Sequence, residues 1–179
     1  MSGEEASPAV EATAEDAGEV FLRVASSDAF VSMENGLEQL IIKSHWRGED
    51  VLVVRHTETG RVWATGNSCP HAGYALNEGD IEDVGQHLEF ALKLDAPVIS
   101  CPAHSYIFEM RRGTCVSEPK CPGTTVYGAR MHGDGSVLIT QVPREGGEVD
   151  THVLTRDESN KVQLKMVEIA LNKKYGSGP

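Results

Sequence analysis

The chain has 179 residues, which is enough for one ordinary domain with extensions at its ends. Its 16 Lys and Arg side chains against 27 Asp and Glu give a net charge of −11, which argues against binding to nucleic acid or to an anionic membrane. Four cysteines are too few for a disulfide-dense scaffold, and no stretch has the roughly 18 continuous apolar residues of a membrane span. We therefore expect a cytoplasmic protein whose cysteines bind metal or do chemistry.

The first 19 residues differ in composition from the rest of the chain. Residues 1–19 contain six acidic side chains and no basic one, among mostly Ala, Ser, Gly and Pro. Such a segment cannot bury enough apolar surface to offset the entropy lost on ordering. We expect a disordered acidic tail.

From residue 20 onward the sequence has the short β-branched runs and intervening turns of a β protein. The expected strands are residues 20–24, 40–44, 51–56, 61–65, 125–130 and 136–140. Turn-forming residues at 57–60 and 132–135 each indicate a hairpin. Residues 88–94 and 161–171 fit a strand or a helix equally well. The apolar positions of the second run are expected to pack on the base sheets, which are the sheets formed by the strands before and after the middle of the chain. The overall expectation is an all-β fold, either a sandwich or a small barrel.

Two short motifs between these β regions carry metal-binding residue types. The first is Cys69-Pro70-His71, and the second is Cys101-Pro102-Ala103-His104, with 29 residues between His71 and Cys101. Thiolate and imidazole are the ligands that soft and borderline metals prefer, and two loops with one of each give four ligands. The proline after each cysteine fixes φ and stiffens the loop.

The spacing distinguishes two kinds of centre. Structural zinc sites usually pair two cysteines two to four residues apart with two histidines three to five apart. A single residue between Cys69 and His71 is awkward for two ligands on one zinc ion, whereas it suits ligands on different irons of a binuclear cluster. Zinc, or no metal at all, remains open at this point.

The residues around these motifs resemble a Rieske [2Fe–2S] domain. Cys-Pro-His-x-Gly and Cys-Pro-x-His are followed by Ile107-Phe108, by Gly113, and by a proline-containing segment at 118–123 like the loop that covers the cluster in that family. The resemblance spans residues 20–145, with a cluster-binding subdomain at about 67–124 and a C-terminal extension at 146–179. A longer gap between the ligand loops, with 84–97 as the insertion, departs from the family pattern.

The resemblance implies both a fold and a ligand set. The family fold has three antiparallel sheets, with the ligand loops at the tip of a small cluster-binding subdomain. Cys69 and Cys101 are then expected to bind one iron, and His71 and His104 the other. In that geometry the thiolates lie inward and the imidazoles reach the surface, where a redox partner would dock.

Motifs for a complete redox enzyme are not found in the sequence. It has no dinucleotide-binding glycine fingerprint and no P-loop. The expected function is therefore one-electron carriage by a Rieske-type ferredoxin, which takes an electron from a reductase and passes it to an unknown acceptor, without a substrate site of its own. Two alternatives are a small subunit of a nitrite-reductase-like or oxygenase complex, and a cluster-bearing sensor module.

The remaining two cysteines and the ligand loops bear on redox behaviour. Cys115 and Cys121 are expected to be free thiols that pack as small apolar groups, and a disulfide between them is the alternative. In the Rieske family that this sequence resembles, high-potential members carry one further cysteine in each ligand loop, where this chain has Tyr74 and Ala103. A low reduction potential is expected.

Overall fold

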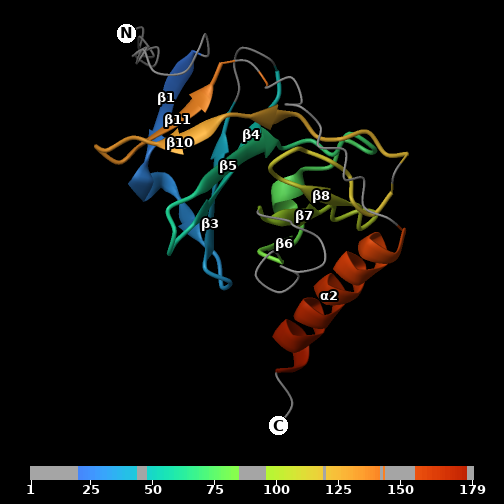
Figure 1. The fold of residues 1–179 in the computed structure, drawn as a ribbon. Coiled ribbons are helices and arrows are strands. Elements are labelled where there is room, and N and C mark those ends of the chain that lie inside the picture. Colours follow the sequence, from blue (N-terminus) through green and yellow to red (C-terminus); the bar gives the residue numbers. More distant parts are fainter. Residues whose placement is uncertain are drawn as a thin grey trace, which may run out of the picture.

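The computed structural model describes residues 20–43, 48–84, 96–118, 120–141, 143 and 156–176. Within them the chain forms three antiparallel sheets and one long helix (Figure 1). The first sheet has the order β1 (Phe21–Ser26), β11 (Ser136–Thr140), β10 (Ala129–Met131). The second has the order β2 (Val31–Ser32), β3 (Leu37–Ile42), β4 (Val51–His56), β5 (Val62–Gly66), β9 (Val126–Tyr127). The third has the order β6 (Ile81–Glu82), β7 (Val98–Ser100), β8 (Ile107–Glu109).

The all-β expectation with three antiparallel sheets is confirmed, and most expected strands are present. One expected strand, 125–130, is instead two strands that belong to different sheets. The break falls at Gly128, whose N–H donates to Thr140 Oγ1 and whose carbonyl accepts from the Thr140 N–H. These two bonds bring the chain from the second sheet to the first.

Strand β4 lies at the centre of the molecule and is buried on both faces. Val51 and Val53 pack toward β11 and Tyr127, while Leu52 and Val54 pack toward the third sheet. Successive side chains of a strand point to opposite faces, so a strand with two covered faces reads as an unbroken apolar run. The unbroken apolar run of β4 therefore reflects its position, with the first sheet packed on one face of the strand and the third sheet on the other.

Residues 156–175 form helix α2 (Arg156–Tyr175), which settles the choice between strand and helix for 161–171. Val162, Met166 and Ile169 face a cluster of buried residues that includes Val98 of β7 and Ile107 of β8. The expectation that this segment packs on the base sheets is wrong, because the contact is with the third sheet, beside which the helix lies (Figure 1). The spacing of four and three residues places these side chains on one helix face.

Several expectations concern residues outside the described parts of the chain. They are the acidic tail at 1–19, the ambiguous run at 88–94, most of the insertion at 84–97, and the first part of the extension at 146–179. Among the described helices, none has the length and apolar character needed to cross a membrane.

Candidate metal centre

The two motif loops fold into the same turn. In the first, the Cys69 N–H donates to the Tyr74 carbonyl at 2.8 Å and the Gly73 N–H donates to the Cys69 carbonyl at 2.7 Å. In the second, the Cys101 N–H donates to the Tyr106 carbonyl at 2.7 Å and the Ser105 N–H donates to the Cys101 carbonyl at 2.9 Å. Each cysteine thus begins a six-residue turn that is closed by the backbone of a tyrosine.

The fifth residue of each turn has a left-handed backbone conformation. Gly73 has φ 72° and Ser105 has φ 56°, and Ser105 is the only non-glycine with positive φ among the described residues. Glycine adopts this conformation without steric cost, whereas other residues are strained there. A strained serine at the position matching Gly73 shows that the turn is imposed by the surrounding structure.

The four candidate ligands separate into a buried pair and an exposed pair. Cys69 and Cys101 are each 1% exposed and belong to one apolar cluster with Leu76 and Phe108. His71 and His104 are exposed, and their ring centroids lie 4.9 Å apart with the rings nearly perpendicular. The structure therefore brings together all four residues that the sequence singled out.

The Cys69 thiol is held in an environment that opposes its ionisation. Burial raises the pKa of Cys69, and the adjacent Cys101 thiol adds to this, while the backbone N–H groups of Ala72 and His71 act in the opposite direction. Amide donors aimed at a sulfur stabilise the thiolate form. A bound metal ion would offset this effect of burial, because its positive charge stabilises the thiolate and its binding displaces the thiol proton.

Two tyrosines flank the histidine rings, and sequence reasoning did not place them there. Tyr106 is half-buried, and its ring lies 4.6 Å from that of His71 in an edge-to-face arrangement. Tyr74 is 52% exposed, with its ring 6.5 Å from that of His104. Both tyrosines close the ligand turns, so the shared turn geometry is the signal that could have located them.

The donor set fits a binuclear cluster better than a single ion. Among the described residues, no three His, Cys, Asp or Glu side chains converge on a point that one metal ion could occupy. A structural zinc ion takes four ligands around one centre, whereas a Rieske cluster takes two thiolates at one iron and two imidazoles at the other. A buried thiol pair beneath an exposed imidazole pair matches the second arrangement.

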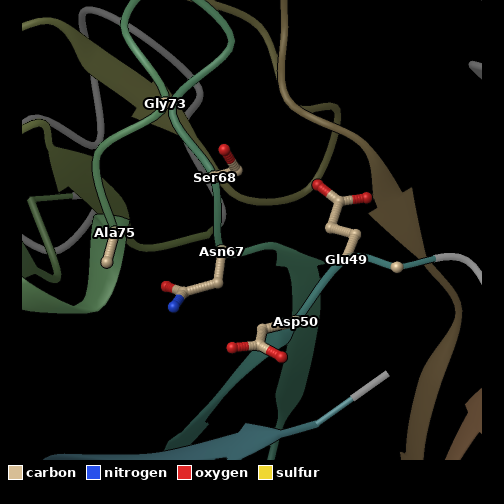
Figure 2. A pocket seen from close by; sticks show the side chains of 7 residues that line it. Glu49, Asp50, Asn67, Ser68, Gly73 and Ala75 are labelled. Carbon is tan, nitrogen blue, oxygen red and sulfur yellow. The ribbon is translucent and has the colours of Figure 1, made fainter. Parts of the chain in front are cut away.

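An open pocket of about 510 Å³ lies against the first ligand loop, and none of the four candidate ligands lines it. Its wall combines the turn at 48–50 with Asn67, Ser68, Gly73 and Ala75. Figure 2 shows the side chains of Glu49, Asp50 and Asn67 around this space. The pocket gives the ligand loop an acidic flank that the linear sequence did not reveal.

Comparison with known proteins finds a matching family and similar structures. The model of the Rieske [2Fe-2S] domain family matches residues 38–128. A structure described as a NADH-dependent nitrite reductase small subunit from Mycobacterium tuberculosis is 21% identical, with a TM-score of 0.52 over 69% of this chain and 96% of that one. The ferredoxin of carbazole 1,9a-dioxygenase from Nocardioides aromaticivorans IC177 is 25% identical, with a TM-score of 0.47 over 69% and 98% of the two chains. No curated protein sequence matches the chain.

Proposed function

The chain belongs to the Rieske [2Fe-2S] domain family, and on this premise we propose that it is a one-electron carrier of the Rieske ferredoxin type. We propose Cys69 and Cys101 as ligands of one iron and His71 and His104 as ligands of the other. The observation that carries the proposal is the adjacent pair of exposed imidazoles above an adjacent pair of buried thiols. When bound, the [2Fe–2S] cluster supplies one-electron redox chemistry.

The protein's own residues set the conditions for electron transfer. Leu76, Phe108 and Met110 are almost fully buried around the thiols and exclude water from the cysteine side of the site. His71 and His104 reach the surface, so an approaching redox protein can contact the imidazole edges directly. The edge-to-face contact with Tyr106 holds the His71 ring in one orientation.

The partners and the location follow from the same features. We propose that a reductase donates the electron and that a second redox protein accepts it, because both candidate histidine ligands are exposed where another protein can contact them. A cytoplasmic location is supported by the four cysteines, all of which are unpaired thiols as in reducing compartments.

The ligand set is tested with the full-length purified protein. We expect iron and acid-labile sulfide in equal amounts, and a Rieske-type electron paramagnetic resonance (EPR) signal on reduction. His71→Ala and His104→Ala should each lose that signal, whereas His132→Ala, at an exposed hairpin histidine, should keep it. Zinc in place of iron and sulfide in the wild-type protein would contradict the ligand assignment.

Electron carriage is tested separately by kinetics. Stopped-flow mixing with a flavin-dependent reductase and NADH should reduce the cluster, and a high-potential acceptor protein such as cytochrome c should then reoxidise it. A protein that contains the cluster but exchanges electrons with neither would be a sensor or structural module instead.

A second candidate function is a small subunit of a larger redox enzyme. Helix α2 favours it, because Leu164, Val167 and Leu171 are each more than half exposed. Exposed apolar side chains that form a continuous surface often mark a contact with another protein. Stable co-purification with a catalytic subunit would support this function, whereas a monomer that is active as a carrier would contradict it.

A further inference from the structure

Two cysteines outside the proposed ligand set lie together beside the cluster-binding loops. Cys115 is 6% exposed and is a member of the apolar cluster that contains Cys69 and Cys101. Cys121 is half-buried and packs against the same cluster. Both are free thiols, and the function proposed above uses neither.

The backbone around these cysteines is held on both sides. On one side, the backbone of Cys115 forms an isolated antiparallel β-bridge with Phe108 of β8, and the Val116 N–H donates to the Ile107 carbonyl at 2.8 Å. On the other side, the Cys121 N–H donates to the Glu118 carbonyl at 3.0 Å. Each thiol is therefore presented from an anchored segment.

The two anchored segments lie against each other. The Thr124 N–H donates to the Gly113 carbonyl at 2.8 Å, and a Cβ added to Gly123 would lie 2.7 Å from that same carbonyl oxygen. Cys121 packs against the apolar cluster to which Cys115 belongs, and the Cys115 thiol is a side-chain hydrogen-bond partner of Cys121. A disulfide forms without backbone movement only between such neighbouring positions.

We propose that Cys115 and Cys121 are a redox-active dithiol, which a low-molecular-weight disulfide such as glutathione disulfide oxidises to an intramolecular disulfide. The thiolate of Cys121, the more accessible of the two, attacks one sulfur of glutathione disulfide and releases one glutathione. Cys115 then attacks the Cys121 sulfur of this mixed disulfide and releases the second glutathione. The two cysteine sulfurs are oxidised, two glutathiones leave reduced, and they carry the two thiol protons.

The environment of Cys121 makes the reduced form persistent. Burial, followed by the neighbouring Cys115 thiol, raises the pKa of Cys121 to about 12. Only the thiolate attacks a disulfide, so burial of Cys121 slows the first step.

A disulfide here would connect the segment after Glu118 to the segment that pairs with Phe108 of β8. Cys69 and Cys115 belong to one buried cluster and Cys121 packs against it, so the pair lies close to a proposed cluster ligand. The modification site thus adjoins the metal centre without using any of its ligands.

The experiment uses the cluster-loaded protein, incubated with glutathione disulfide and then alkylated, digested with trypsin and analysed by mass spectrometry. Cleavage after Arg112, Lys120 and Arg130 places the two cysteines in separate peptides, 113–120 and 121–130. The wild-type protein should yield these peptides joined by a disulfide, with loss of both alkylated forms. Visible absorption before digestion verifies that the cluster is retained.

Two serine variants test the order of the steps. Cys115→Ser should keep glutathione attached to Cys121, because the resolving thiol is missing. Cys121→Ser should leave Cys115 reduced and free of glutathione, because Cys115 is buried. Two alkylated peptides from the oxidised wild-type protein, or glutathione that stays on its Cys121, would overturn the proposal.

Discussion

Gly79 packs closely against the chain that leads into the second ligand loop. A Cβ at this position would lie 1.7 Å from the backbone oxygen of Ser100, the residue that precedes Cys101. A backbone atom cannot rotate away as a side chain can, so Gly79→Ala must displace the chain at the start of the ligand turn. We expect a loss of roughly 1–3 kcal/mol in stability and a lower iron content per protein. Thermal unfolding and iron analysis measure the two effects.

The matched control for this substitution is Gly133→Ala. Nothing lies within 4 Å of a Cβ at Gly133, and its φ is outside the left-handed range. Its stability should therefore stay within about 0.5 kcal/mol of the wild type, with full iron content. Equal effects of the two substitutions would show that crowding at Gly79 does not position the ligand loop.

At the residue scale, the sequence singled out candidate ligands more readily than the side chains that surround them. Spacing and residue type were enough to select the four candidate ligands, because few residue types bind iron or zinc. The ring contact of Tyr106 with His71 depends on how two loops far apart in sequence approach each other. The strained backbone of Ser105 was also hidden, because serine gives no local signal for a positive φ.

At the element scale, helix α2 provides a direct test of its own docking. Met166 lies on the face against β7 and β8 and is 9% exposed, whereas Leu164 on the opposite face is 69% exposed. We expect Met166→Ala to cost about 2 kcal/mol, at the lower end for truncating a buried side chain because the helix packs on one side only. Leu164→Ala should change stability by less than about 0.5 kcal/mol.

Thermal unfolding and hydrogen exchange of the helix amides measure these two variants. Alanine is the best helix former, so neither substitution weakens the helix itself. Faster exchange in Met166→Ala alone would support docking through this face. Faster exchange of equal size in both variants would contradict it.

The same helix shows why local patterns predicted its structure poorly. Val162, Leu164 and Met166 alternate like the residues of a half-buried strand. In the helix, Val162 and Met166 are on the docked face and Leu164 is on the exposed one. Apolar residues on two opposite faces of a helix erase the single apolar stripe from which a helix is recognised. Strand β4 was easier to predict, because each of its faces packs on a separate apolar cluster.

At the scale of the whole molecule, we expect charge to tune the proposed centre. The chain carries a net charge of −11, and Glu49 and Asp50 flank the pocket beside the first ligand loop. Negative charge opposes the addition of an electron, although salt screens the more distant groups. The amides of His71 and Ala72, which stabilise the Cys69 thiolate, act in the opposite direction.

Because of the acidic net charge, we expect the reduction potential at the low end of the range of Rieske centres, which runs from about −150 to +300 mV. Tyr74 and Ala103 stand where high-potential relatives are expected to have cysteines, so a disulfide cannot join the two ligand loops. Protein-film voltammetry near neutral pH measures the midpoint, and increasing the salt concentration should raise it, because screening weakens the repulsion between the acidic surface and the added electron. A low midpoint suits reduction by a flavin-dependent reductase. A midpoint near the top of the range would contradict both the predicted tuning and the role of a ferredoxin.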